Sequence, residues 1–384
     1  MSTVQNPELS TGMFNQLEPD SLIAQFALHP PNDFDVFCTP DGAPAFLADF
    51  DLLTTADARL RRLIARLPLS GYWSRLLRPR TCFIGTTVSE YALLPRAPAP
   101  DALVASLMRQ YARAHPWLIV KDIPQRSPLL DADANAFADA LAHACQGAGW
   151  VLLQGQALAY VPVDFASTDE YLARLSSGRR RDIRRKLRAR SELQVEALPT
   201  GDPGFADAAL LEEFYALYLA VYAQSEIHFD RLSPEFFRAM LRDGDSGGVV
   251  FVYRHDGRMI GYNICFVAHG NLLDKYVGFR YPQARQYNLY FVSWMHNLDY
   301  ACAHGLRHYI AGWTDPEIKA YLGASFTFTR HAVHVRNPLL RAVVRRIAGR
   351  FESDRQWQSG NPIQFAPDAA PLHEIGTHAI GNRS

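Results

Sequence analysis

The hydrophobic and polar positions of the first half follow two periods, and these periods predict its secondary structure. A period of two indicates strands, and a period of three to four indicates helices. In residues 36–50, two apolar runs flank a Pro-Asp-Gly turn, which is typical of a hairpin. The pattern then predicts a helix at 55–67, a strand at 81–94, a helix at 101–115, a strand at 117–124, a helix at 133–149 and two paired strands within 150–164.

The second half repeats this order. Residues 249–268 again form two apolar runs around an Asp-Gly turn. The remaining predicted elements are helices at 205–223 and 233–242, a strand at 271–279, a helix at 290–305, a strand at 306–312, a short helix at 315–323 and a strand at 326–336. The repeat indicates two similar units of about 150 residues in tandem.

The order of elements predicts an α/β fold with mixed (α+β) sheets, because the two hairpins disfavour a doubly wound parallel sheet. We expect six segments along the chain. They are an N-terminal extension (1–30), a first unit (31–166), a basic connecting helix (167–192), a second unit (193–336), an amphipathic helix (337–358) and a tail (359–384).

Charge and cysteine content change this picture little. Lys plus Arg equals Asp plus Glu, at 39 each, so any attraction for polyanions has to be local. The five cysteines are far apart in apolar surroundings, which is typical of reduced thiols in a cytoplasmic protein. No segment approaches the length of a membrane span, and the sequence predicts neither a metal site nor a tightly bound cofactor.

One local charge run stands out, "GRRRDIRRKLRARS" at residues 178–191. Ile183 and Leu187 are four residues apart and can anchor one face of a helix. The stretch joins the two units, so Arg180 and Arg184 could meet an anionic part of a ligand in a shared cleft or belong to a solvated connecting helix.

Several sequence segments of the second half resemble the GCN5-related N-acetyltransferase (GNAT) superfamily, and especially its tandem FemAB-like branch of acyl and aminoacyl transferases. They are "EYLARLSSGRRRDIRRKLR", "SEIHFDRLSPEFF", "DGRMIGYNICF" and "NLYFVSWMHNLDYACAHGLRHYIAGWTDPEIKAYLGA". The most specific is the last, with Lys319 and Gly323 in a K-x-x-x-G pattern. The resemblance covers roughly residues 35–335 and implies two tandem GNAT-like units.

The resemblance also implies a reaction, in which an acyl or aminoacyl group passes to an amine acceptor. Typical acetyl-CoA enzymes of the superfamily hold the pyrophosphate with a Gly-rich loop at a helix N-terminus. Here "ARQYNLYFV" stands at that position without glycine. Acyl-CoA, a carrier-bound acyl group and aminoacyl-tRNA therefore all remain open as co-substrates, with tRNA as a possible partner. The sequence does not indicate an oligomeric state.

Titratable residues gather on the strand at 271–279 and in the loop after it. By strand alternation, Asp274 and Tyr276 should share one face and Lys275 the other. Asp274 could act in catalysis or pair with a neighbour. We expect substrate contacts from Tyr276, from Trp313 at a strand's carboxyl end, and from the loop residues Arg280, Tyr281, Arg285, Tyr287 and Asn288.

Two further residues are candidates for catalysis. The family pattern implies that Lys319 stands near the transferred acyl group and stabilises the oxyanion or binds the donor. A solvated helix lysine is the alternative. His228 in "SEIHFD" could be a base near neutral pH or a structural histidine. No cysteine or serine lies beside a plausible base, so we expect direct attack by the amine.

In the first unit, polar residues at strand ends are candidates for acceptor binding or for a structural role. They are Thr86, Ser89, Glu90, Lys121 and Asp122.

Two other functions remain open. A non-catalytic nucleic-acid-binding or anion-binding protein could use the basic helix at 178–190, although binders of this kind usually spread basic charge along a whole face. Residues 337–351 alternate apolar residues with Arg at helical spacing, which suits either a membrane surface or packing on the protein's own domain.

Overall fold

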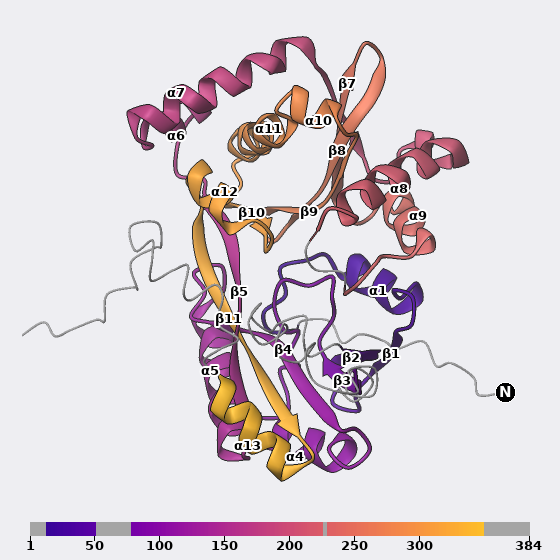
Figure 1. Cartoon of the computed structure of the whole chain (residues 1–384), viewed down its shortest axis with the longest axis vertical. Helices are drawn as coiled ribbons and strands as arrows, with labels where there is room; N and C mark the ends of the chain where they lie inside the picture. The colour runs from indigo at the N-terminus through magenta and orange to yellow at the C-terminus, as the bar shows by residue number, and fades with distance from the viewer. Residues whose placement is uncertain (1–12, 51–77, 226–228, 349–384) are drawn as a thin grey trace, which may run out of the picture.

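The computed structural model describes residues 13–50, 78–225 and 229–348 (Figure 1). The strands are β1 (Asp35–Cys38), β2 (Pro44–Asp49), β3 (Arg80–Ile84), β4 (Trp117–Gln125), β5 (Val151–Pro162), β6 (Gln194–Pro199), β7 (Gly248–His255), β8 (Arg258–Ala268), β9 (Asn271–Phe279), β10 (His308–Gly312) and β11 (Ser325–Val335). The helices are α1 (Asp20–Leu28), α4 (Pro100–Tyr111), α5 (Ala132–Gly147), α6 (Thr168–Ala173), α7 (Ser177–Lys186), α8 (Ala208–Tyr222), α9 (Pro234–Arg242), α10 (Gln283–Gln286), α11 (Leu289–Ala303), α12 (Pro316–Leu322) and α13 (Pro338–Ile347). The helix expected at 55–67 falls outside these residues.

All the described strands belong to one mixed sheet, in the order β1-β2-β3-β4-β11-β5-β10-β9-β8-β7-β6. Two groups of strands share one pairing pattern. The strands β1, β2 and β3 pair antiparallel and β3 pairs parallel with β4, just as β7, β8 and β9 pair antiparallel and β9 pairs parallel with β10. The predicted α/β fold with a repeated unit is confirmed.

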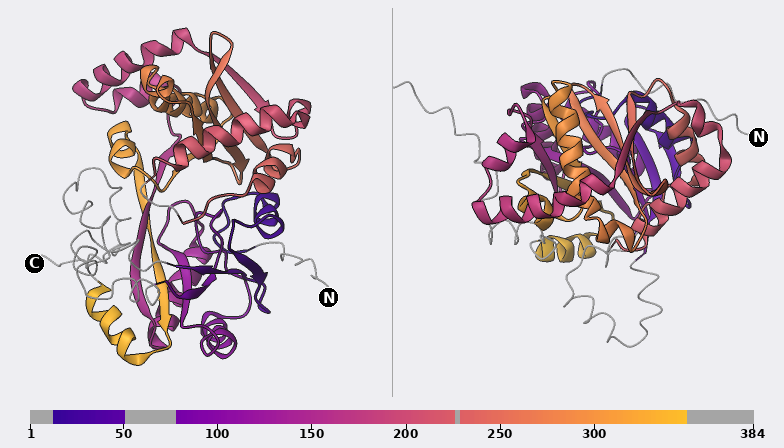
Figure 2. Two further views of the ribbon diagram at one scale, coloured as in Figure 1. Left: turned by 45° about the vertical axis from the view of Figure 1, so that its right-hand side comes forward. Right: turned by 90° about the horizontal axis from the view of Figure 1, so that it is seen from above.

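Each group is completed by a strand from the other half of the chain. β11 pairs antiparallel with β4, and β5 pairs antiparallel with β10. These two long strands also pair with each other and run side by side between the two halves of the molecule (Figures 1 and 2). The two units have therefore exchanged their last strands.

Two sequence predictions in the first half are wrong in their details. Residues 151–162 form the single strand β5 instead of a pair, because the strand pairs with β11 along most of its length and with the short strand β10 at its end. Gly155 does not turn the chain. A Cβ there would clash with Thr329 Oγ1, so glycine permits the close approach of β11.

The strand expected at 81–94 ends at Ile84 instead. Gly85 has φ +129°, a conformation that L side chains rarely adopt, and the chain leaves the sheet there. Residues 85–94 form a loop whose Tyr91 is fully buried against Leu273 and Ile310 of the second unit. The loop therefore packs the first unit against the second.

Both faces of the second unit's sheet are covered, which explains why its strands read as nearly continuous apolar runs. On one face, Val250 and Val252 of β7 pack with Phe214 of α8 and Phe236 of α9. On the other face, Phe251 packs with residues of α11. The hairpin between β7 and β8 turns at Asp256 and Gly257, which have φ +47° and +74° as a type I′ turn requires.

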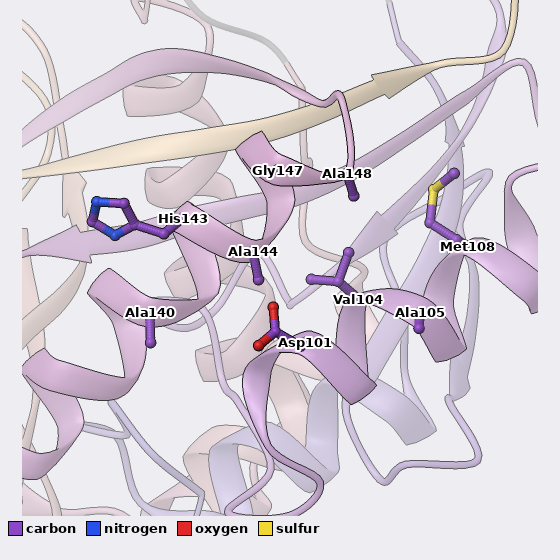
Figure 3. Close-up of a pocket in the computed structure, with 9 residues that line it drawn as sticks. All are labelled: Asp101, Val104, Ala105, Met108, Ala140, His143, Ala144, Gly147 and Ala148. Carbon is purple, nitrogen blue, oxygen red and sulfur yellow. The ribbon is translucent and has the colours of Figure 1, made fainter.

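Two further features concern the helices. In the part of the chain that the structure covers, no helix combines the length and apolarity needed to cross a bilayer. A shallow groove of about 600 Å³ lies between α4 and α5 and is lined by residues that include Val104, Met108 and Ala144 (Figure 3). None of the predicted site residues lines it.

Candidate active site

The parallel strands β9 and β10 separate after a short paired stretch. Their register pairs Asn271 with His308, Leu272 with Tyr309 and Leu273 with Ile310. Beyond this point, Asp274 on β9 has no partner on β10. A Cβ built on Gly312 would lie 3.9 Å from both the Asp274 carbonyl oxygen and Lys319 Nζ. Lys319 therefore stands where the two strands diverge.

The helix α12 holds Lys319 in this position. Asp315 (φ +54°) precedes the helix, Pro316 occupies its first turn, and Gly323 (φ +101°) ends it. The Gly323 N–H donates to Ala320, and the Ala324 N–H donates to Lys319. A left-handed residue at this position lets the chain turn directly into β11. The K-x-x-x-G spacing thus places the lysine one turn before the glycine that ends the helix.

The Lys319 ammonium group is buried and donates two hydrogen bonds to backbone carbonyls. Nζ lies 2.7 Å from the Ala311 oxygen and 3.1 Å from the Gly312 oxygen, and the residue is 4% exposed. Burial lowers the pKa of Lys319 to about 8, against the opposing charges of Asp274, Asp315 and Glu90. An ammonium group has three N–H donors, so one is left for a ligand.

Asp274 is surrounded by hydrogen-bond donors. Its oxygens accept from Asn263 Nδ2 (3.0 and 2.9 Å), Asn297 Nδ2 (2.9 Å) and the Tyr309 hydroxyl (2.9 Å). Burial raises its pKa despite these hydrogen bonds. Because these donors come from β8, α11 and β10, the carboxylate ties the helix to the sheet beside Lys319.

The expectation that Asp274 and Tyr276 share a face is wrong. β8 and β9 contain a bulge that pairs Ile264 with Tyr276 and the next residue, Cys265, with Asp274. A bulge inserts one extra residue and reverses the alternation beyond it. Asp274 therefore faces α11, and Tyr276 packs on the opposite face, with its ring centroid 6.2 Å from that of Phe236.

The loop residues after β9 are largely engaged within the protein. Arg280 bonds the Met259 oxygen (2.9 Å) and Glu213, Arg285 donates to Gln224 Oε1 (2.8 Å), and the Tyr287 hydroxyl lies 2.9 Å from His255 Nε2. Arg285 also lies over the ring of the half-buried Tyr281, at 5.1 Å. These contacts shape the loop around its own side chains.

The backbone of this loop is also committed. Asn288 has φ +49° and precedes α11. The N–H groups of residues 284–288 donate to carbonyls of the loop itself, and those of Phe291 and Val292 donate to the Asn288 oxygen. A phosphate cradle needs successive N–H groups that are free to face the anion. This loop does not supply that run of donors.

The basic helix α7 divides its cations between structure and solvent. Arg179 donates to the carbonyls of Ala320 (3.0 Å) and Tyr321 (3.3 Å) at the end of α12. Arg180 donates to the Ala173 oxygen (3.2 Å), and Arg184 pairs with Asp169 (2.8 Å). In the described part of the chain, Arg181 makes no ion pair. Figure 1 shows α7 beside α11 at the top of the molecule.

The remaining predicted residues have different surroundings. Trp313 follows Gly312 and packs edge-on against Tyr91, with ring centroids 6.3 Å apart. His228 lies outside the described residues. Asp230, two residues later, lies before α9. Burial raises its pKa to about 6.

Sequence reasoning missed a buried ion-pair cluster between the units. Lys275 Nζ lies 2.5 Å from Glu90 Oε1 and 3.5 Å from Glu18 Oε1. Lys275 lies in the largely apolar strand sequence "NLLDKYVGF", and a lysine in such a strand indicates a buried carboxylate partner. Glu18 gave no such signal, because nothing in its neighbourhood suggests burial.

Comparison with known proteins adds a family to this geometry. Residues 177–320 match the model of the acetyltransferase (GNAT) domain. This segment of the chain, residues 177–320, is assigned to the GNAT domain. The GNAT domain includes α7, the diverging strands β9 and β10, and Lys319. The prediction of a GNAT-related acyltransferase is confirmed. No curated protein matches the chain in sequence.

The chain is also similar to solved structures at low sequence identity. The C-terminal DUF2156 domain of a candidate lysylphosphatidylglycerol synthetase from Agrobacterium fabrum is 15% identical, with a TM-score of 0.52 over 86% of this chain and 92% of that one. L-PGS from Bacillus licheniformis is 10% identical, with a TM-score of 0.49 over 88% and 99%. FemX is 12% identical, with a TM-score of 0.48 over 85% and 98%.

Proposed function

We propose that this acyltransferase moves an acyl or aminoacyl group from a thioester or an aminoacyl-tRNA to an amine acceptor. The observation that carries the proposal is the Lys319 ammonium group, fixed by two carbonyls where β9 and β10 diverge. An oriented hydrogen-bond donor in a buried site stabilises developing negative charge more strongly than one in water does. The carbonyl of the acyl donor would lie against the third N–H of Lys319.

The transfer proceeds in two stages. The nitrogen of the neutral amine attacks the donor carbonyl carbon, a C–N bond forms, and the carbonyl oxygen becomes an oxyanion that Lys319 stabilises. The C–S or C–O bond to the leaving group then breaks. The proton lost by the amine ends on the leaving sulfur or oxygen, so the reaction needs no oxidant or reductant.

The buried cysteines support direct attack over a covalent intermediate. The cysteine near the site, Cys265, lies 3.7 Å from Asp274 Oδ1, and burial raises the pKa of its thiol well above the ordinary value. Burial also raises the pKa of Cys82 and Cys145 to about 12. The thiolate is the nucleophilic form, so these thiols are poor nucleophiles at neutral pH.

For the donor, we favour aminoacyl-tRNA over acyl-CoA. The loop before α11 uses its backbone N–H groups internally, which disfavours the usual pyrophosphate cradle. The exposed arginines of α7, among them Arg181, suit a polyanionic donor. The Agrobacterium relative is named for lysylphosphatidylglycerol, a compound with an aminoacyl group. A tRNA donor would imply a cytoplasmic enzyme, which is the compartment that we propose.

The decisive experiment measures transfer from radiolabelled aminoacyl-tRNA and from acyl-CoA to a panel of amines, with wild type and Lys319→Ala. We expect a covalent amide product with one donor class and its loss in the variant. Glu317→Gln is the matched control, because Glu317 is exposed on the same helix. Unchanged turnover in Lys319→Ala would remove this residue from the site.

A nucleic-acid-binding protein without catalysis is the second candidate, and α7 is the observation in its favour. Its arginines are partly neutralised within the chain, because Arg184 pairs with Asp169 and Arg185 pairs with Asp182. This function predicts binding of uncharged tRNA and unrelated RNA alike, with no product formed. A preference for aminoacylated over deacylated tRNA would contradict it.

A further inference from the structure

A group of ionisable residues joins the two units on the face of β9 opposite Asp274. We call Glu18, Glu90, Asp230, Lys275 and Tyr276 the junction cluster. Glu18 precedes α1 and Glu90 lies in the loop after β3, whereas Lys275 and Tyr276 belong to β9 and Asp230 precedes α9. The cluster therefore combines segments from both halves of the chain.

The contacts within the cluster are tight and exclude solvent. Lys275 bonds Glu90 Oε1 at 2.5 Å and lies 3.5 Å from Glu18 Oε1, with exposed side-chain fractions of 7%, 3% and 0% for these three residues. The backbone N–H of Glu90 donates to Glu18 Oε1 at 2.7 Å. One lysine thus holds two carboxylates in a nearly dry environment.

The charges in the cluster are not balanced. Asp230 is close enough to Lys275 and Tyr276 for its charge to act on both, so three carboxyl groups surround the one ammonium group of the cluster. Two further cations are near it. Lys121 is committed to Asp122 and to the Thr86 oxygen, and Lys319, on which the charge of Glu90 acts, is held by two backbone carbonyls. Glu18 and Glu90 are buried and Asp230 is partly buried, and an excess of carboxylates in such surroundings is unfavourable unless another cation compensates for it.

Two buried polar atoms in the cluster also lack hydrogen-bond partners among the described residues. They are Glu90 Oε2 and the Tyr276 hydroxyl oxygen. Buried polar groups are nearly always paired in folded proteins, so unpaired ones call for an explanation. Both atoms can accept a hydrogen bond, and neither is needed for the ion pair that Lys275 makes through Oε1.

We propose that the junction cluster binds the ammonium group of a cationic acceptor, an inference that rests on the proposed transfer to an amine. An ammonium group donates three hydrogen bonds and accepts none, which matches the unpaired acceptors Glu90 Oε2 and Tyr276 Oη. Its charge offsets the surplus carboxylate. The charge of Glu90 acts on Lys319 as well, so the cluster borders the acyl-transfer site.

The proposal defines the acceptor by its chemistry. It is a primary aliphatic amine that arrives protonated and gives one proton to a carboxylate of the cluster before its neutral nitrogen attacks the acyl donor. A neutral isostere of the same shape should bind poorly. We therefore choose 1,5-diaminopentane against 1,5-pentanediol, and glucosamine against glucose, as paired probes. Binding to the full-length chain is measured by ligand-observed NMR without donor, so that this test does not depend on turnover.

We expect at least one amine to bind at least tenfold more tightly than its neutral partner. Glu90→Gln should abolish this difference, and Glu196→Gln, an exposed position on β6, should leave it unchanged. Equal binding of both amines and their neutral partners, or binding of none of the four probes, would overturn the proposal.

Because Glu90→Gln strands a buried lysine and could unfold the protein, Tyr276→Phe provides the second test. Removing an unpaired buried hydroxyl should leave the thermal midpoint equal or higher, and should weaken amine binding several-fold. Unchanged amine binding in a folded Tyr276→Phe protein would contradict the site. If the amines do not bind but Lys319-dependent transfer is observed, only the acceptor site is contradicted. If no transfer is observed, the proposed function and the acceptor site are both contradicted.

Discussion

Lys319 Nζ lies 2.7 Å from the carbonyl oxygen of Ala311, at the end of the strand that diverges from β9. This contact fixes the direction of the ammonium group before any donor binds. Loss of one oriented donor to an oxyanion typically lowers kcat by about 100- to 1000-fold. We expect Lys319→Ala to show this loss with the fold retained, measured by kcat and by circular dichroism. A change below about tenfold would argue against a role for Lys319 in the transition state.

The depressed pKa of Lys319 predicts the pH dependence of the reaction. Its pKa is lowered from an ordinary 10.5 to about 8 by burial, so the group is an ammonium below pH 8 and a neutral amine above it. Only the ammonium form stabilises an oxyanion by its charge. We expect kcat to fall about tenfold per pH unit above pH 8. The residual activity of Lys319→Ala should lack this limb, and a wild-type profile that stays flat to pH 10 would contradict the assignment.

Asp274→Asn tests whether the carboxylate holds α11 to the sheet. The substitution turns an amide NH₂ toward the donors on Asn263, Asn297 or Tyr309, and one of them then loses its acceptor. We expect the free energy of unfolding to fall by about 2–3 kcal/mol, measured by denaturant titration. Asp256→Asn is the control, because its side chain is 90% exposed in a hairpin turn. Equal free energies of unfolding for the two variants would show that the hydrogen bonds around Asp274 do not stabilise the fold.

Two arginines that are two residues apart on α7 should behave differently. Arg179 bonds the last carbonyls of α12, so Arg179→Ala should lower the free energy of unfolding by about 1–2 kcal/mol. Arg181 is exposed, so Arg181→Ala should change stability by less than about 0.5 kcal/mol. If α7 meets tRNA, Arg181→Ala should instead reduce the slope of log affinity against log salt by about 0.7. An unchanged slope would show that Arg181 of α7 does not contact the tRNA donor.

Gly323 sets the end of the helix that carries Lys319. A Cβ at this position would lie 2.8 Å from the Tyr171 hydroxyl and from Leu175 Cδ2, and φ is +101°. Gly305 ends α11 at φ +62° with nothing within 4 Å of an added Cβ. Gly305→Ala should cost about 1–2 kcal/mol of unfolding free energy for its backbone conformation alone, and Gly323→Ala should cost more. We also expect only Gly323→Ala to lower kcat, because it displaces α12.

Local pattern predicted most of the elements, and non-local contacts explain what it missed. The turn at Asp256 and Gly257 and the helix end at Gly323 depend on neighbours in the chain, so the sequence contains their signals. The bulge beside Lys275 depends on the opposing strand, and strand alternation alone therefore placed Tyr276 on the wrong face.

The same distinction applies to the candidate site. Lys319 could be named because its spacing to Gly323 is a local motif. Glu18 and Glu90 meet Lys275 only after the two units join, so no window of sequence contains this relationship. The partners that engage Arg280 and Tyr287 likewise come from α8 and β7, which are distant in sequence.

The exchange of β5 and β11 has a consequence for how the protein is made. During synthesis β4 emerges from the ribosome long before β11, the strand that pairs with it over residues Trp117 to Gln125. Until residues 325–335 have been translated, the edge of β4 and the outer side of β5 lack their shared neighbour. The nascent first unit therefore waits with exposed strand edges for most of translation, and a chain that stalls before β11 is a natural substrate for chaperones.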